Sequence, residues 1–169
     1  MQKILREIPE SFETERLLLR CPRAGDGAVL YEAASESADE LRLWLPWMTA
    51  DYCPDDSEAW VRRMQARFIA RETISFLLFL KGEDKLVGGC GLIVCDWEVP
   101  KFEIGYWART SQTGHGYITE AVNGVVRLAI DTLGANRLEI RCDTKNDRSA
   151  AVAKRVGFVL EGTLRCDTR

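Results

Sequence analysis

Histidine is almost absent from this 169-residue chain, which contains a single one, His115. None of the six cysteines belongs to a C-x-x-C pair, and zinc sites usually combine such pairs with histidine. We therefore expect no metal centre. A surplus of positive charge is lacking too, because 23 basic residues face 26 acidic ones and leave a net charge of −3. Nucleic-acid-binding domains usually carry a basic patch, so we expect no nucleic-acid partner.

Long apolar runs are missing as well. No stretch approaches the roughly 18 apolar residues of a membrane-spanning helix, and the first residues lack the apolar centre of a secretory signal. Scattered cysteines in such a chain are typical of a reducing compartment, where thiols stay unpaired. The sequence therefore predicts no membrane partner and a cytoplasmic location.

The chain is long enough for one hydrophobic core. Hydrophobic residues make up 46% of it, and two full domains would be cramped in this length. No linker, repeat or low-complexity segment interrupts it. We expect a single domain over residues 1–169.

Periodicity of apolar residues predicts a mixed α/β (α+β) domain with element order β-α-α-β-β-β-α-β-α-β. We expect one short strand within residues 12–20, and further strands at residues 74–80, 86–95, 102–108, 136–142 and 158–164. The expected helices are residues 28–35, 58–72 and 117–133, and a last one that follows residues 145–149 and ends at Val156. A short turn joins the second and third strands, which indicates a β-hairpin.

One strand–loop–helix segment, residues 102–133, carries two glycines where its helix is expected to begin. A helix start offers unpaired N–H donors and the positive end of the peptide dipoles. Gly114 and Gly116 would let an anion approach that backbone closely. The loop around them is rich in threonine, serine and glutamine and contains no acid. These features predict a cradle for a pyrophosphate.

The segment LRLWLPWM, residues 41–48, places two tryptophans, three leucines and a proline together. One interpretation is a helix end packed on the core, since large aromatic residues are often simply buried. The other is an apolar wall over a binding cleft, shared with the helix expected at residues 58–72. In the second interpretation the substrate-binding residues are Trp44, Leu45, Pro46 and Trp47.

The segment GYWARTSQTGHGYITEAV, followed downstream by NDRSAAVAKRVGF, resembles the GNAT superfamily of acetyl-CoA-dependent N-acetyltransferases. ERLLLR near the start and LRLWLPWM resemble its RimJ/RimL branch, which acetylates the N-terminal amines of ribosomal proteins. The resemblance implies a mostly antiparallel sheet flanked by helices. It also implies acetyl-CoA as donor, direct attack in a ternary complex, and a primary amine as acceptor, with a protein N-terminus as the candidate.

The resemblance further implies that strand 103–108 pairs its backbone with the pantetheine arm and that loop 113–118 binds the pyrophosphate. The implied cofactor-binding residues are Tyr106, Trp107, Ala108, Gln112, Thr113, Gly114, His115, Gly116, Tyr117, Ile118, Thr119, Asn146 and Ser149. The loop departs from the family pattern at Thr113, where Gln or Arg is usual, and at Ile118, where a small residue is usual. For Asn146 and Ser149, plain N-capping of a helix is the alternative interpretation.

Acyl transfer to an amine needs a base, a donor for the oxyanion and a proton for the leaving thiolate. Glu103 is the candidate base, because it shares a strand face with Gly105 and Trp107 and the glycine would leave room for a ligand. The alternative is a charge at the cleft edge that only orders water. A backbone N–H near Tyr106 is the expected oxyanion donor, and Ser149 is the candidate to assist thiolate protonation through water.

GNAT chains normally add a final strand after the one ending near Leu164, and this sequence stops at Arg169. An unfinished sheet edge invites pairing, so we expect a homodimer or reduced stability. Two other functions stay open. One is a non-catalytic acyl-CoA-binding module. The other is a dinucleotide-binding domain, because Glu139 follows the glycine pair at about the fingerprint distance, although Thr119 replaces the third glycine.

Overall fold

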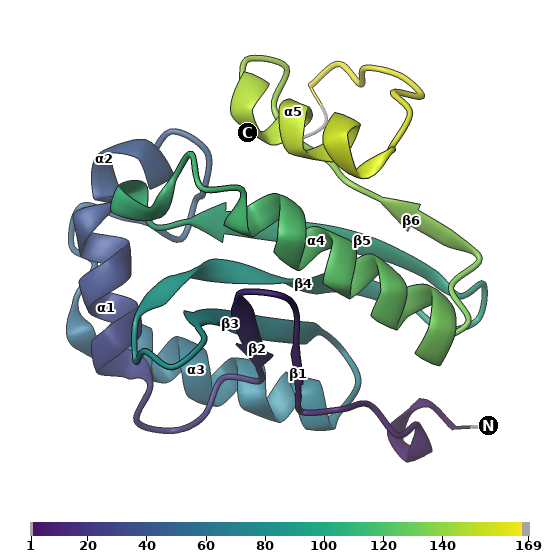
Figure 1. Cartoon of the computed structure of the whole chain (residues 1–169), viewed down its shortest axis with the longest axis horizontal. Helices are drawn as coiled ribbons and strands as arrows, with labels where there is room; N and C mark the ends of the chain where they lie inside the picture. Colours follow the sequence, from purple (N-terminus) through teal and green to yellow (C-terminus); the bar gives the residue numbers. More distant parts are fainter. Residues whose placement is uncertain (1, 167–169) are drawn as a thin grey trace.

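The computed structural model describes residues 2–166, which form one six-stranded sheet with helices on both faces (Figure 1). The strands follow each other across the sheet in chain order: β1 (Ser11–Glu13), β2 (Leu17–Arg20), β3 (Ile74–Leu80), β4 (Leu86–Asp96), β5 (Lys101–Ala108) and β6 (Arg137–Glu139). All neighbours are antiparallel except β5 and β6, which are parallel. The expected mixed, mostly antiparallel sheet is confirmed.

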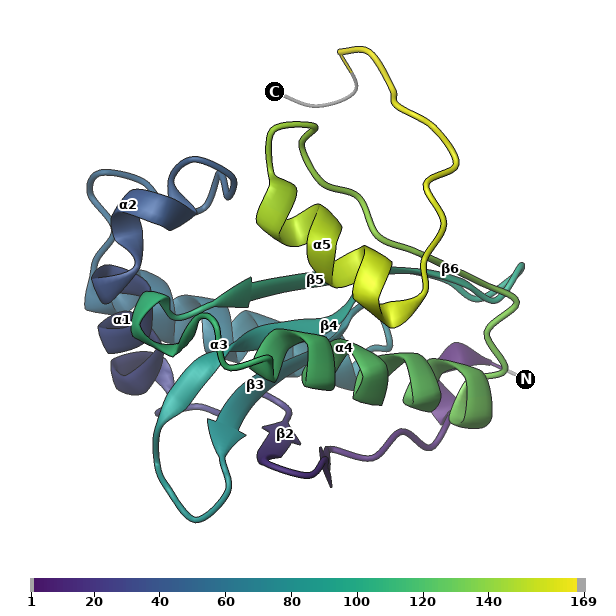
Figure 2. The same ribbon diagram turned by 45° about the horizontal axis from the view of Figure 1, so that its top comes forward.

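The helices form two layers. The elements are α1 (Gly27–Glu36), α2 (Ala38–Leu41), α3 (Pro54–Ile69), α4 (Tyr117–Arg127) and α5 (Asp147–Val156), with a π-helical turn (Leu128–Thr132) that continues α4 and 3-10 turns at Lys3–Leu5 and Thr110–Gln112. Helices α1 and α3 pack on each other beneath one face, and α4 crosses the other (Figure 1). Helix α5 packs beside α4 (Figure 2).

Strand β3 lies at the centre of the hydrophobic core. Its alternate residues Phe76 and Leu78 belong to the cluster under α4, whereas Leu77 and Phe79 belong to the cluster under α1 and α3. A strand covered on both faces must be apolar at nearly every position. The continuous run of residues 74–80 in the sequence is therefore explained.

Strands β5 and β6 part after a short pairing. Their register runs only from Lys101 with Arg137 to Glu103 with Glu139. Beyond that point the chain after β6 leads away from β5 towards α5 (Figure 2). Within residues 2–166, the edge of β5 that faces away from β4 therefore has no strand beside it from residue 104 to 108.

The prediction of a strand at residues 158–164 is wrong, because this segment is irregular in the structure. Val159 and Leu160 are 83% and 85% exposed, so no neighbouring layer buries them. An ion pair between Glu161 and Arg137 joins the segment to β6, which is itself shorter than the expected 136–142. The expectation that no strand follows Leu164 falls partly on residues 167–169, which lie outside the described part.

Other boundaries differ from the expectation as well. The short strand expected within residues 12–20 is β2, and a second strand, β1, precedes it because Thr14 makes a turn, with its N–H donating to Leu17 O at 2.9 Å and its hydroxyl accepting from Leu17 N at 3.2 Å. Helix α3 begins at Pro54, four residues early, because Cys53 and Asp56 form a capping box.

The six cysteines are all free thiols, of which Cys21 and Cys90 are buried and Cys142 and Cys166 are exposed. No helix of the described chain combines the length and apolar character that crossing a bilayer requires.

Candidate active site

The glycine loop adopts the conformation that its sequence predicts. Gly114 and Gly116 have φ of 81° and 80°, the left-handed region that glycine enters without a steric penalty. Gly116 is the N-cap of α4, and the first hydrogen bond of the helix runs from Glu120 N to Gly116 O at 3.0 Å. The N–H groups of residues 117–119 precede that bond and point out of the helix end. They are therefore available to an anion.

The turn between β1 and β2 holds this loop in place. The Arg16 guanidinium donates to His115 O at 2.9 Å and to Glu120 Oε2 at 2.7 Å, and it lies 4.7 Å above the ring of Tyr117. The Thr14 hydroxyl donates to Glu120 Oε1 at 2.6 Å. Sequence reasoning missed Arg16 and Thr14 in this role, because they are distant in the chain.

Glu120 is the one acid near the helix start. Burial by itself would raise the pKa of Glu120, but hydrogen bonds from Thr14 and from the backbone and guanidinium of Arg16 outweigh it, so the pKa is lowered. The carboxylate therefore stays ionised and is neutralised by Arg16. As a result it does not cancel the attraction of the helix start for an anion.

The other end of the loop is tied to α1 through Arg109, a buried residue just after β5. Its guanidinium donates to Glu36 Oε2 at 2.6 Å and to Glu32 Oε1 at 2.7 Å. Ser111 N donates to Glu36 Oε1 at 3.0 Å. The bonds from Arg109 and Ser111 lower the pKa of Glu36 to about 2. An ionised carboxylate of α1 thus fixes the start of the loop.

The unpaired edge of β5 presents main-chain donors. Arg109 N donates to Val87 O of β4 at 2.9 Å. Because successive N–H groups of a strand point to opposite edges, those of Ala108 and Tyr106 point away from β4. A ligand with amide groups can add to such an edge as an extra strand does.

Tyr106 and Ser149 are brought together across the gap that β5 and β6 leave. The Tyr106 hydroxyl donates to Ser149 O at 2.8 Å and accepts from Ser149 Oγ at 3.0 Å. Burial raises the pKa of Tyr106, and the hydrogen bond with Ser149 offsets part of that rise. Asn146 is the N-cap of α5, and its side chain accepts from Ser149 N at 3.1 Å. The structure thus shows the capping role for Asn146.

Glu103 is half-buried on β5, and the alternation of the strand puts it on one face with Gly105 and Trp107. The room expected above Gly105 is not there, because a Cβ at this position would lie 2.9 Å from Ile93 Cδ1. Ile93 occupies the bulge between Leu92 and Val94 of β4, and the extra residue turns its side chain over the glycine. The role of Glu103 as base stays a prediction.

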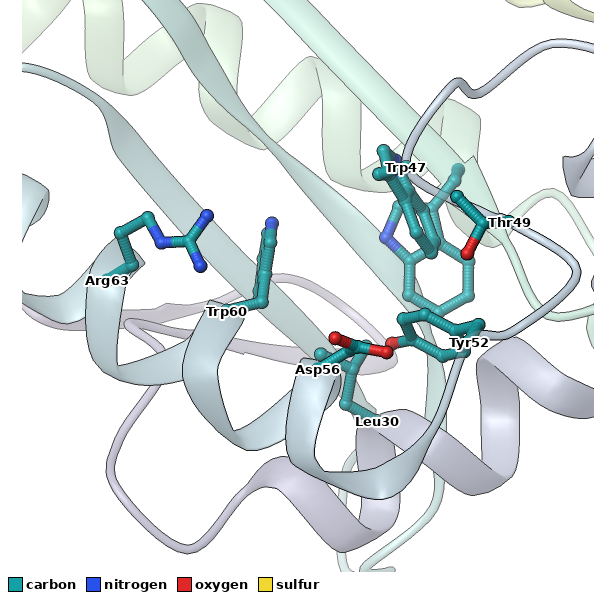
Figure 3. Close-up of a pocket in the computed structure, with 8 residues that line it drawn as sticks. Leu30, Trp47, Thr49, Tyr52, Asp56, Trp60 and Arg63 are labelled. Atoms are coloured by element: carbon teal, nitrogen blue, oxygen red, sulfur yellow. The ribbon is translucent and has the colours of Figure 1, made fainter.

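A pocket of about 220 Å³ opens beside Trp107 (Figure 3). Its residues come from α1, from the chain after α2, from α3 and from β5, and they are Leu30, Trp47, Thr49, Tyr52, Asp56, Trp60, Arg63 and Trp107. The three from α3 lie one turn apart and so share a helix face. The helix expected at residues 58–72 thus contributes to this pocket through Trp60 and Arg63.

Of the four residues expected to bind the substrate, Trp47 lines the pocket. Leu45 packs instead beside a small buried cluster that includes Met48, and Trp44 and Pro46 are exposed outside the pocket. The reason is local: Leu45 N donates to Leu41 O at 2.7 Å, so the segment is helical there and turns successive side chains in different directions. Sequence reasoning missed Tyr52, Asp56 and Thr49, which show no pattern before the chain is folded.

Comparison with known proteins agrees with this geometry. Residues 16–159 match the family described as acetyltransferase (GNAT) domain. The uncharacterized N-acetyltransferase p20 of Bacillus licheniformis is 27% identical over 158 residues, which cover 92% of this chain and 86% of p20. The ribosomal-protein-serine acetyltransferase of Escherichia coli (strain K12) is 33% identical over 90 residues, 53% of this chain and 49% of that protein. The latter match spans about half of the relative.

Solved structures show the same fold. The ribosomal L7/L12 α-N-protein acetyltransferase RimL, in complex with coenzyme A, superposes with a TM-score of 0.84 at 21% identity and covers 96% of this chain and 89% of its own. The microcin C7 self-immunity acetyltransferase MccE, in complex with acetyl-CoA and AMP, superposes with a TM-score of 0.83 at 21% identity, covering 91% and 85%. The family match confirms the resemblance to GNAT acetyltransferases seen in the sequence and argues against a dinucleotide-binding domain. This protein belongs to the GNAT acetyltransferase family.

Proposed function

We propose that the protein is an acetyl-CoA-dependent N-acetyltransferase that transfers the acetyl group to a primary amine by direct attack in a ternary complex. The observation that carries the proposal is the open edge of β5, which leads straight into a loop whose helix-start N–H groups are available. An extended chain that ends in a diphosphate fits this arrangement, since the first part needs strand-like donors and the second needs an anion site.

Acetyl-CoA would lie with its pyrophosphate at residues 113–118 and its pantetheine arm along residues 104–108. The polar loop residues Gln112, Thr113 and Thr119 supply further hydrogen-bonding groups there. The Thr119 hydroxyl already accepts from Arg155 Nε at 3.3 Å, which brings a second cation to the loop beside Arg16. Ser149, held by Tyr106, lies on the α5 side of the same gap.

The reaction forms a C–N bond and breaks a C–S bond. The neutral amine attacks the thioester carbon while Glu103 takes the amine proton, directly or through water. A main-chain N–H at the open edge of β5, near Tyr106, stabilises the oxyanion. The leaving thiolate takes a proton from water, and Ser149 assists this step. The Ser149 hydroxyl donates a hydrogen bond to the Tyr106 hydroxyl.

The acceptor would enter through the pocket beside Trp107. A protein amine is the proposed acceptor class, and relatives named for acetylating ribosomal proteins support it. A cytoplasmic location belongs to the same proposal, because the six free cysteines fit a reducing compartment. We also propose that the protein self-associates as a homodimer. Val159 and Leu160 expose most of their apolar surface to water, and a second copy could cover it.

Release of the free thiol from acetyl-CoA, measured with a panel of amines and peptides, tests the proposal. We expect Glu103→Gln to lower kcat by about 10²- to 10⁴-fold, because a lost general base costs that much, and to leave acetyl-CoA binding intact. Glu98→Gln, the same change on an exposed turn, is the matched control. Tight coenzyme binding without turnover on any amine would favour the non-catalytic acyl-CoA-binding module instead.

A further inference from the structure

Aromatic rings stand on two sides of the pocket beside β5. Figure 3 shows Trp60 on one side of the hollow and Trp47 on the other, with Tyr52 below Trp47 on that second side. The ring centroids of Trp47 and Trp107 are 6.2 Å apart at 71°, and those of Trp47 and Tyr52 are 5.8 Å apart. Trp47, Tyr52 and Trp107 thus pack on one another, and Trp60 packs against the core cluster of α1 and α3, so the walls of the hollow are preformed.

The size of the pocket suits one ring system. Its volume of about 220 Å³ is below the roughly 300–1,000 Å³ that encloses a whole drug-sized ligand. It is also several times the ~30 Å³ that one water occupies in the liquid. A methyl or hydroxymethyl side chain would leave most of the hollow to water against apolar walls. A flat ring would displace that water and pack on the tryptophans.

Charge does not favour an ionic occupant. Asp56 accepts from Cys53 N at 2.9 Å, and the bonds from the Cys53 backbone and thiol lower the pKa of Asp56, so it is ionised at neutral pH. Arg63 carries the opposite charge two turns further along α3. Both are exposed and screened by solvent, and they largely balance each other. Selectivity therefore falls to the aromatic walls.

Trp107 connects this pocket to the reaction site, because it belongs to β5. Glu103 lies on the same face four residues earlier, a distance of about 13 Å along an extended strand. The side chain of Ile93 covers Gly105 between them, so a linker has to pass over it. We infer that the pocket of Trp47, Trp60 and Trp107 holds an aromatic ring of the acceptor, joined to the reacting amine by a linker of several atoms. This inference rests on the proposed N-acetyltransferase activity and names its acceptor class.

Binding of three matched amines tests the inference directly. The amines are 4-phenylbutylamine, 4-cyclohexylbutylamine and butylamine, and quenching of tryptophan fluorescence gives their Kd. We expect 4-phenylbutylamine to bind roughly tenfold more tightly than butylamine, because its ring buries apolar surface and also makes aromatic contacts. The affinity of 4-cyclohexylbutylamine should lie between the two, because its saturated ring only buries apolar surface. Three Kd values within twofold of each other would overturn the inference.

The variant Trp60→Leu removes one aromatic wall and keeps an apolar side chain. We expect it to abolish the preference for the phenyl compound and to leave coenzyme A affinity unchanged, whereas Trp60→Phe retains part of the preference. Ile69→Ala, on an exposed position of the same helix, is the matched control and should keep the full preference. A thermal melt of each variant shows whether it is folded. A preference that survives in folded Trp60→Leu would contradict the assignment.

Thiol release separates this inference from the proposed function. Ring-selective binding without release on any amine would overturn the enzymatic proposal and keep the ring site. Release at equal kcat/KM on all three amines would keep the enzyme and overturn the ring site. A peptide that begins with phenylalanine, compared with the same peptide beginning with alanine, shows whether the ring comes from a peptide or from a small amine.

Discussion

The two sides of the candidate active site are built differently. The proposed coenzyme side consists of main-chain groups from one continuous stretch, β5 and the loop that leads into α4. The proposed acceptor side consists of side chains from α1, the chain after α2, α3 and β5. Main-chain recognition depends on local conformation, which nearby residues encode, whereas a side-chain pocket exists only once distant elements pack together. The first kind of site is thus far easier to recognise in a sequence.

The two sides nevertheless share helix α1. Leu30 of α1 lines the acceptor pocket, and Glu32 and Glu36 of the same helix hold Arg109 at the start of the coenzyme loop. We therefore expect a change in α1 to affect both sides. The first of the following changes tests this expectation, and the others test the proposed coenzyme side.

The largest effect is expected for Glu36→Gln, which removes the charge between Arg109 and Ser111. Hydrogen bonds to a charged group contribute more than neutral ones, so we expect a loss of about 2 kcal/mol in the free energy of unfolding at neutral pH. The KM for acetyl-CoA should rise as the loop loosens. If the amine KM rises equally, the two sides are not independent. Urea unfolding and initial rates measure these quantities.

The same variant should change how stability depends on pH. The folded pKa of Glu36 is lowered from 4.5 to about 2, so the unfolded chain binds the proton more readily between these values. The contribution of Glu36 is therefore present above about pH 4.5 and is lost as the pH falls through 2. Urea unfolding from pH 5 to 2 should show a shallower loss in Glu36→Gln than in the original protein. Glu83→Gln, in the exposed turn after β3, should leave the slope unchanged.

A smaller effect on stability is expected for Gly116→Ala. This variant tests whether the backbone of the loop binds the coenzyme. Both Gly116 and Gly134 have positive φ, and a Cβ at either position meets no close contact. Alanine at either should therefore cost about 1–2 kcal/mol of unfolding free energy. Only Gly116→Ala should also weaken coenzyme A binding, measured by calorimetry. Equal coenzyme affinity in the two variants would argue against the loop as the anion site.

The smallest effect is expected at Asn146, where capping and coenzyme contact compete as explanations. Asn146→Ala should cost about 1 kcal/mol of unfolding free energy, because it removes the bond to Ser149 N. Asn146→Asp keeps the cap and should keep the stability. If the amide also donates to the coenzyme, Asn146→Asp weakens coenzyme A binding several-fold. Unchanged affinity would leave capping as its only role.

Local patterns predicted several parts of the structure well. The apolar run of β3, the β3–β4 hairpin and the start of α4 at Gly116 all follow from neighbouring residues. The prediction of a strand at residues 158–164 was wrong, because a strand depends on contacts with distant parts of the chain. A strand needs a paired neighbour and a buried face, and an apolar stretch such as Val159 and Leu160 shows neither in the sequence.

The candidate site divides in the same way. The glycine loop was recognisable because positive φ and a helix start are local properties of Gly114 and Gly116. The support from Arg16 was not recognisable, because its contacts with His115 and Glu120 join residues 99 and 104 positions apart in the chain. Among the aromatic residues near position 45, Trp47 faces the pocket and Trp44 does not, because the helical turn after α2 points successive side chains in different directions.

By itself, the sequence determined a mixed sheet and a glycine loop at the start of a helix, because hydrophobic periodicity and glycine placement act over a few residues. Tertiary structure alone decided the shape of the acceptor pocket, the link from α1 to Arg109 and the meeting of Tyr106 with Ser149. The reason is physical: these contacts join residues far apart in the chain, and their energies arise only after the sheet and both helical layers have closed around the core.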